Sequence, residues 1–127
     1  MKFHEDRTAA NIVTAWGEGE IRVRDEPIRN SVILTPDRII HPWSGRSIDT
    51  LTVEDLAPVL ALTPAILVLG TGRRLAFPAP ALQGAILARG IGLEVMDTPA
   101  ACRTFNILVH EGRSVAAALI IEPVDTA

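Results

Sequence analysis

The segment from Ile66 to Ile121 constrains the fold more than any other part of the chain, because its pattern alternates between strand and helix. Ile66 to Leu69 is a continuous apolar run that ends in glycine, as expected of a central strand covered on both faces. Pro80 suits a first helical turn, and Gly90 suits the position after a helix. The pattern predicts, in chain order, a strand at 66–69, a helix from Pro80, a strand at 93–96, a helix that runs to about His110 behind Thr98 as N-cap and Pro99 as first residue, and a strand at 114–121.

Two consecutive β-α-β units imply right-handed crossovers and a largely parallel core. The first half of the chain predicts antiparallel strands instead. Residues 20–24 alternate polar and apolar side chains, the pattern of a strand with one face in water. Pro36–Asp37 is typical of a tight turn between two strands. The expected elements are strands at 12–16, 20–24, 31–35 and 38–40, a break at Asp25–Glu26–Pro27, and a short or kinked helix at 53–60 behind Thr52 as N-cap.

Length and composition bound the class of protein. A chain of 127 residues is long enough to bury a core, so we expect a single α/β domain over residues 1–127 with a mixed sheet. Apolar residues supply 48% and charged residues 21% of the chain, which excludes wholesale disorder. The net charge is −3, and no basic block is present. This balance argues against a nucleic-acid binder.

Three features of the sequence bear on the cellular location of the protein. The N-terminal stretch MKFHEDRTAANIV has acidic residues where an export signal needs an apolar run. The longest apolar stretches are too short to cross a bilayer. The lone cysteine, Cys102, excludes an internal disulfide and fits a reducing compartment. We therefore expect a cytoplasmic protein without a transmembrane segment, for which peripheral contact with a membrane complex stays open.

Polar residues gather at the ends of two predicted strands, Gly70–Thr71–Gly72 and Asp97–Thr98. In an open α/β sheet such strand ends usually line the functional crevice. A dinucleotide-binding turn needs a third glycine where this chain has Leu75, and the phosphate-loop pattern also fails after Gly72. Arg73 and Arg74 remain candidates for binding an anion, or they are solvated arginines beside a tight turn.

A second polar set comprises Asp97, Thr98, Arg103 and Asn106. Arg103 and Asn106 are three residues apart, so they share a helix face and are expected to point back toward Asp97. These groups could hold a small ligand at the strand end. Alternatively, Asp97 and Thr98 cap the helix, Arg103 pairs with Asp97, and Asn106 satisfies a loop carbonyl.

Cys102 near the start of a helix has two interpretations. A helix N-terminus and the neighbouring Arg103 favour a reactive thiolate, but a buried cysteine commonly acts as a small hydrophobic residue. No base can be assigned to it, and the histidines and carboxylates lack metal-ligand spacing. We expect no catalytic residues, no metal and no cofactor.

Several stretches of the sequence resemble the Mth-domain family. They are Ser31–Pro36, Gly70–Thr71–Gly72, Gly90–Thr98, Ala101–Asn106 and Glu111–Leu119, so the resemblance spans nearly the whole chain. The family includes mitochondrial NADH dehydrogenase (complex I) assembly factor three and an adipogenesis-associated Mth-domain protein. The resemblance implies a three-layer domain, in which a mixed central sheet of about five strands carries helices and an extra layer comes from an N-terminal antiparallel hairpin.

For function, the resemblance implies a non-enzymatic factor that binds protein partners, in the biogenesis of a respiratory or other membrane complex. This hypothesis predicts an exposed apolar patch that includes Trp16, Trp43 or Phe77, and it is compatible with a homo-oligomer. The alternative is a small-molecule binder or enzyme with a polar crevice at the ends of strands 66–69 and 93–96. Its residues would be Thr71, Arg73, Asp97, Arg103 and Asn106.

Overall fold

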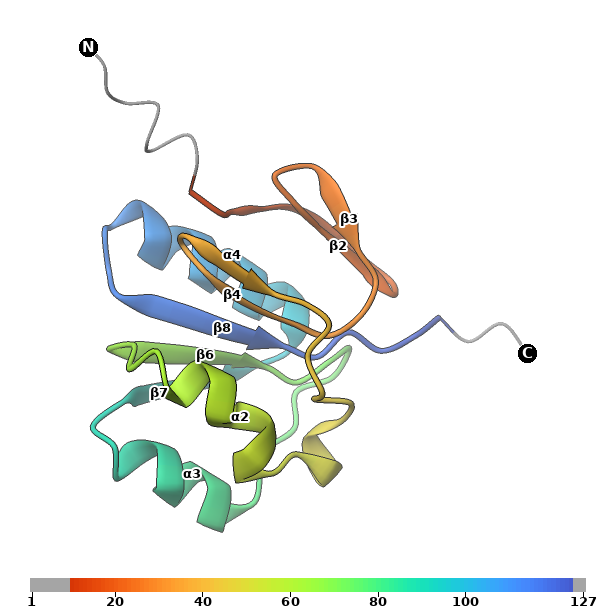
Figure 1. Cartoon of the computed structure of the whole chain (residues 1–127). Helices are drawn as coiled ribbons and strands as arrows, with labels where there is room; N and C mark the ends of the chain where they lie inside the picture. Colours follow the sequence, from red (N-terminus) through yellow and green to blue (C-terminus); the bar gives the residue numbers. More distant parts are fainter. Residues whose placement is uncertain (1–9, 125–127) are drawn as a thin grey trace.

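The computed structural model describes residues 10–124, so the prediction about the first residues of the N-terminus lies outside the described part of the chain. The elements alternate as the sequence predicts in the second half, after an N-terminal half made of strands (Figure 1). In chain order they are β1 (Val13–Gly17), β2 (Glu20–Val23), β3 (Glu26–Ile28), β4 (Val32–Thr35), β5 (Arg38–Ile40), the 3₁₀ turn η1 (Ile48–Thr50), α2 (Val53–Leu60), β6 (Ile66–Gly70), α3 (Pro80–Leu87), β7 (Gly92–Met96), α4 (Thr98–His110) and β8 (Val115–Leu119).

A five-stranded mixed sheet forms the centre of the molecule, in the order β5-β4-β8-β6-β7. β6 pairs in parallel with both β7 and β8, as two β-α-β units require. β4 runs antiparallel to both β5 and β8. The prediction of an α/β domain with a mixed sheet of about five strands is therefore confirmed.

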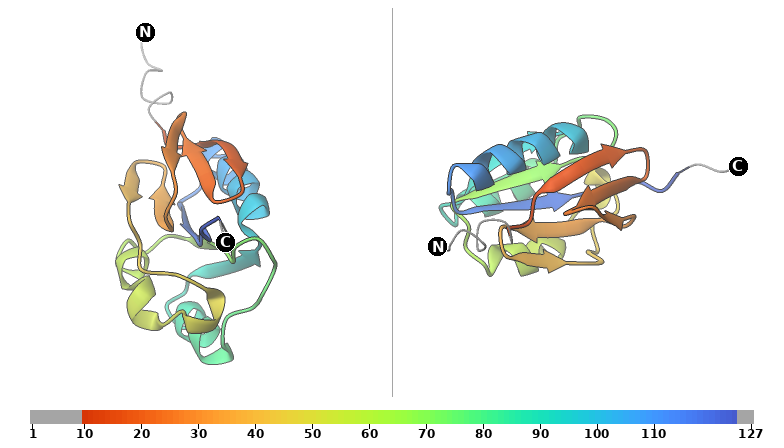
Figure 2. Two further views of the ribbon diagram at one scale, coloured as in Figure 1. Left: turned by 90° about the vertical axis from the view of Figure 1, so that its right-hand side faces the viewer. Right: turned by 90° about the horizontal axis from the view of Figure 1, so that it is seen from above.

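Alternating residues of the central strands divide the core into two halves, one on each face of the sheet. Leu67 and Leu69 of β6 pack with α2 and α3, whereas Val68 between them packs with α4 and the N-terminal strands. This alternation follows from the two-residue period of a strand. Figure 2 shows the resulting three layers, with α4 on one face of the sheet and α2 and α3 on the other.

A separate three-stranded antiparallel sheet, β1-β2-β3, lies on the α4 side. The strand predicted at 20–24 ends where Asp25–Glu26–Pro27 was expected to break it, but Glu26 and Pro27 themselves belong to a further strand, β3, which was not predicted. Arg24 and Asp25 alone form the turn, both with positive φ. Pro27 is accommodated because β3 is an edge strand, where a missing N–H costs no ladder bond on the open side.

The helix starts are set by their N-caps. Thr52 and Asp55 form a reciprocal capping box at α2, as the sequence predicts for Thr52. At α4 the cap is Asp97, whose carboxylate accepts a hydrogen bond from the Ala100 amide at 2.9 Å. Thr98 is already the first helical residue, so its predicted role as N-cap is wrong. Its hydroxyl is engaged elsewhere.

Candidate functional site

The glycines at the end of β6 are required by close packing. A Cβ at Gly70 would lie 2.9 Å from the Thr98 hydroxyl oxygen, and Gly72 has a φ of +106°, which L side chains rarely adopt. Between them, the buried Thr71 hydroxyl donates to the Arg74 carbonyl at 2.6 Å and accepts from the Ala76 amide at 3.2 Å. This turn is thus held by its own hydrogen bonds.

Thr98 joins three segments of the chain. Its buried hydroxyl accepts a hydrogen bond from the Gly72 amide at 2.9 Å and donates one to the Ile120 carbonyl at 2.7 Å. The start of α4 is thereby tied to the ends of β6 and β8. Because both hydrogen-bonding functions of the hydroxyl are used, its contacts give Thr98 a structural role.

Arg73 closes the crevice above these strand ends. Its guanidinium pairs with Glu18 at 3.2 Å and with Glu122 at 3.3 Å, and its amide donates to the Glu122 carboxylate at 2.8 Å. Gly72, Arg73 and Thr98 line a cavity here of about 40 Å³. A typical ligand pocket has roughly 300–1,000 Å³, so the β1–β2 turn and the segment after β8 leave little space.

Arg103 and Asn106 face the N-terminal sheet. The Asn106 side chain forms two hydrogen bonds of 2.8 Å with the backbone of Val13, accepting from its amide and donating to its carbonyl. The Arg103 guanidinium stacks over the Trp16 ring, 5.7 Å from the ring centre. Asn106 lines a different hollow from Arg73. The five polar residues of the small-molecule hypothesis therefore do not surround one cavity.

Cys102 is fully buried on the inner face of α4. Burial raises the pKa of its thiol to about 12, although the charge of Arg103 acts in the opposite direction. The thiol is protonated at neutral pH. Of the two interpretations, the structure favours a small hydrophobic core residue.

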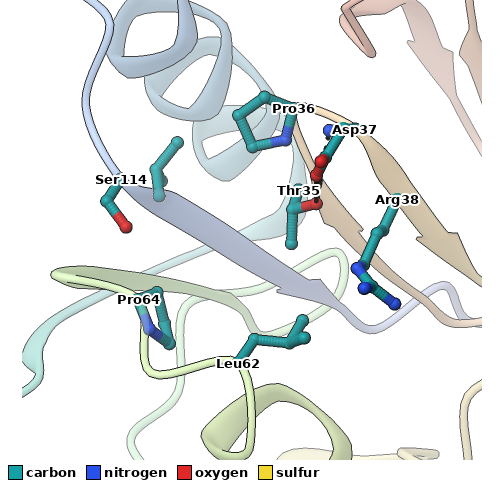
Figure 3. Close-up of a pocket in the computed structure, with 8 residues that line it drawn as sticks. Thr35, Pro36, Asp37, Arg38, Leu62, Pro64 and Ser114 are labelled. Atoms are coloured by element: carbon teal, nitrogen blue, oxygen red, sulfur yellow. Dashed lines mark hydrogen bonds between the residues drawn. The ribbon is translucent and has the colours of Figure 1, made fainter.

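An open hollow of about 450 Å³ lies at the opposite, amino-terminal end of the parallel strands. In Figure 3 the turn Thr35–Arg38 faces Leu62 and Pro64 across the start of β8, with Ser114 at its side. The Asp37 carboxylate accepts a hydrogen bond from the Thr35 hydroxyl at 2.9 Å. The sequence reasoning missed this hollow, because it concentrated on the carboxyl ends of the strands.

A third hollow, of about 600 Å³, is the one we call the β1–α4 hollow. Two of its residues are exposed isoleucines, Ile12 at 41% and Ile107 at 57%. Trp16, on β1, is 38% exposed but does not line this hollow. The full lining is Ala10, Ile12, Asn106, Ile107, Val109, His110 and Glu111. This hollow was not predicted from the sequence. A usable signal was Ile107, an apolar residue whose neighbours on the surface of α4 are polar.

The predicted apolar patch is only partly recovered. Trp16 and Phe77 are exposed, Phe77 at 66%, but Trp43 is 6% exposed and belongs to the core. The Trp43 indole donates a hydrogen bond to the Asp55 carbonyl at 2.6 Å, which allows the large ring to be buried. The expectation that Trp43 lies on the surface is wrong.

Among residues 10–124, no three histidine, cysteine or acidic side chains cluster as metal ligands would. None of the described helices combines the length and the apolarity that crossing a bilayer demands.

Comparison with known proteins identifies relatives of the chain. It is 41% identical over 97 residues to the mouse protein named NADH dehydrogenase [ubiquinone] 1 alpha subcomplex assembly factor 3, a match that covers 75% of this chain and 52% of the mouse protein. Matches to the bovine and rat proteins of the same name are similar. The chain thus spans about half the length of these curated relatives.

Solved structures resemble the whole chain. An NMR structure of a Xanthomonas campestris protein is 37% identical and superposes with a TM-score of 0.85, covering 99% of this chain and 94% of that one. A Bordetella pertussis protein described as a Mth938-like domain is 32% identical, with a TM-score of 0.78 and coverage of 99% and 96%.

The family model described as "Protein of unknown function (DUF498/DUF598)" matches residues 13–120. That range runs from the first residue of β1 to just beyond β8, and so includes both sheets and all three α-helices of the described fold. The chain therefore belongs to the DUF498/DUF598 family, among whose solved relatives is a Mth938-like domain.

Proposed function

We propose that this chain is a non-catalytic protein-binding factor that acts in the assembly of respiratory NADH dehydrogenase or another membrane complex. The observation that carries the proposal is the β1–α4 hollow, a mainly apolar concavity with exposed Ile12 and Ile107 in its lining. Exposed apolar surface of this kind is typical of protein interaction sites. The names of the mammalian relatives support this type of partner.

The chemistry of the strand ends supports a role without catalysis. Thr71, Asp97 and Thr98 use their polar atoms to hold loops and a helix start, and Cys102 is a buried thiol. Of the candidates from the sequence, Asn106 lines the β1–α4 hollow, and Arg103 lies one helical turn before Ile107 on α4. We propose that Arg103 and Asn106 contribute to binding at its rim. Gly70, Gly72 and Arg73 belong to the turn at the other end of α4, next to Thr98.

The hollow suits an apolar side chain or a short helix of a partner. Ile12 and Ile107 form its apolar walls, and His110 and Glu111 lie at its edge. Asn106 already holds the backbone of Val13 by two hydrogen bonds, so the wall of the hollow is preorganised. Preorganisation lowers the entropic cost of binding.

The experiment compares cells that carry the gene with cells that lack it. We expect deletion to lower the amount of assembled NADH dehydrogenase on native gels, and the purified chain to capture subunits of that complex. Ile107→Asp should fail to restore assembly, because it places a charge in the hollow. Ile39→Asp is the matched control, since Ile39 on β5 is 47% exposed and does not line the hollow.

Two outcomes would count against the proposal. Normal levels of every respiratory complex in the deleted cells would exclude an assembly role. Equal rescue by Ile107→Asp and the unaltered chain would exclude the hollow as the binding surface. The expected cytoplasmic location is part of the same proposal, and fractionation of the cells tests it.

A further inference from the structure

The segment that follows β6 has an unusual surface for a protein of negative net charge. From Gly70 to Leu93 the chain contains three arginines and no aspartate or glutamate. Arg73 is paired with Glu18 and Glu122. Arg74 and Arg89 are exposed and form no ion pair with any residue of the described part of the chain. Two unpaired positive charges therefore bracket this segment.

Apolar side chains occupy the surface between these two arginines. Leu75 is 54% exposed, Phe77 66% and Leu87 56%. In α3 every residue other than Gln83 is apolar or glycine, and the exposed side of the helix carries Ala81 and Leu87. A surface helix of a globular protein normally turns polar residues to water. Here the outward side of α3 is as apolar as the inward side.

Hydrogen bonds and packing fix the backbone that carries these apolar side chains. The Thr71 hydroxyl holds both the Arg74 carbonyl and the Ala76 amide. Pro78 is buried, and its carbonyl accepts a hydrogen bond from the Gln83 amide group at 3.1 Å. α3 itself packs on β7 and α2 and forms the outer margin of the molecule in Figure 1. Leu75 and Phe77 are thus held outward, and no residue of the described chain covers them.

We propose that the α3 face, defined as Arg74, Leu75, Phe77, Ala81, Leu87 and Arg89, docks on an anionic lipid surface. The apolar side chains enter the boundary between head groups and acyl chains, and the two arginines contact lipid phosphates. Binding at a membrane interface grows with the apolar area that is buried and with electrostatic attraction to anionic lipids, and this face offers exposed apolar side chains between two arginines. The long arginine side chains can reach the head groups while the helix lies deeper.

Charge and shape favour lipid over the other occupants. A second copy of the chain would bring arginines against arginines, since the segment has no acidic residue to pair with them. None of the three hollows described above is lined by Leu75, Phe77 or Leu87. The exposed side chains of this face protrude outside those hollows, and a lipid surface conforms to protruding side chains. The β1–α4 hollow is on the other side of the sheet, so both surfaces can be occupied together.

The test is co-sedimentation of the full chain with vesicles. One set contains phosphatidylcholine alone, and the other contains added phosphatidylglycerol. We expect binding to the second set only, weakened by salt. Arg74→Gln combined with Arg89→Gln should weaken binding about thirtyfold, because each arginine near an anionic surface contributes roughly a factor of five. Leu75→Ser combined with Phe77→Ser should weaken it at least about tenfold, since it removes the inserting side chains.

The matched control is the double variant Arg38→Gln and Ile39→Ser. Both residues are exposed on β5, at the edge of the sheet opposite β7, so this variant should bind like the unaltered chain. All replaced side chains are exposed, and circular dichroism checks that each variant is folded.

Three results would overturn the proposal. The first is no binding of the unaltered chain to anionic vesicles. The second is equal loss in the control and in the α3-face variants, which would indicate adsorption without a defined face. The third is a dimer in sedimentation without lipid that the Leu75 and Phe77 changes abolish, which would make a second copy the occupant. Failure of the assembly proposal would leave these results unaffected, because vesicle binding requires no protein partner.

Discussion

α4 and α3 cover opposite faces of the same sheet, but they are attached to it differently. α4 is capped by Asp97, bonded to β1 through Asn106 and bonded to two strand ends through Thr98. α3 has no side-chain cap at its start, and Gln83 bonds only the loop just before it. Asp97, Thr98 and Asn106 therefore attach α4 to the rest of the fold, whereas the apolar side chains on the outside of α3 remain exposed. Polarity alone is a poor guide to the binding surface in this fold.

The largest expected difference between the two helices concerns thiol reactivity. With the pKa of Cys102 raised to about 12, its alkylation in the folded protein at pH 8 should be roughly a thousandfold slower than in the unfolded protein. Leu87→Cys in a Cys102→Ala background should react nearly as fast as an unfolded thiol. Mass spectrometry over time measures both rates. Fast labelling of native Cys102 would show that the inner side of α4 is open.

The next largest difference concerns packing. Phe105→Ala removes a fully buried ring on α4 and should lower the free energy of unfolding by about 3–5 kcal/mol. Leu87→Ala on α3 should change it by less than about 0.5 kcal/mol, because the side chain is mostly in water. Urea denaturation measures both. Similar losses would contradict the distinction between a buried α4 and an exposed α3 face.

Thr98→Val tests the attachment of α4 to the strand ends. The change leaves the Gly72 amide and the Ile120 carbonyl without their partner, so we expect a loss of about 2 kcal/mol. Thr104→Val is the matched control on the same helix, because the Thr104 hydroxyl donates only to the Met96 sulfur, a weak acceptor. A loss of stability in Thr98→Val no larger than that in Thr104→Val would show that the Thr98 hydroxyl does not anchor α4 to the strand ends.

The smallest expected effect concerns the N-terminal cap of α2. The neighbouring helix α3, on the same face of the sheet, has no side-chain cap. Hydrogen bonds from Ser44 and Thr52 hold the pKa of Asp55 below its ordinary value of 3.8, against a smaller effect of burial. A lower pKa in the folded state stabilises the protein above pH 3.8, and this stability is lost as the pH falls through the folded pKa. Asp55→Asn should cost about 1 kcal/mol at neutral pH and remove that pH dependence. Thermal unfolding of both proteins across acidic pH measures this dependence. Parallel curves of stability against pH for the two proteins would contradict the prediction.

Much of the fold could be predicted from local pattern. The apolar run at 66–69, the turn at Pro36–Asp37 and the cap at Thr52 each contain their own signal, and each is confirmed. β3 escaped prediction because Pro27 is a strand breaker in general and is tolerated only at an edge. Whether a strand becomes an edge depends on its neighbours, which no local window contains.

The candidate site was less predictable, because contacts distant in sequence determine it. Glu122 and Glu18 reach Arg73 across 49 and 55 residues, and together they fill the crevice that the strand ends would otherwise line. Trp43 became a core residue through a hydrogen bond to Asp55. The sequence shows α3 as a helix without charged residues. Only the structure shows which of its apolar side chains are buried and which remain exposed.

The position of β8 has a consequence for synthesis of the chain. β8 is the last strand in sequence, yet it lies between β4 and β6 in the middle of the sheet. While a ribosome is still making residues 115–119, the β4–β5 hairpin and the β6–β7 pair have no strand to connect them. Each half then exposes an apolar edge, which favours association with other chains. The central sheet of this chain can therefore close only after residues 115–119 have been made.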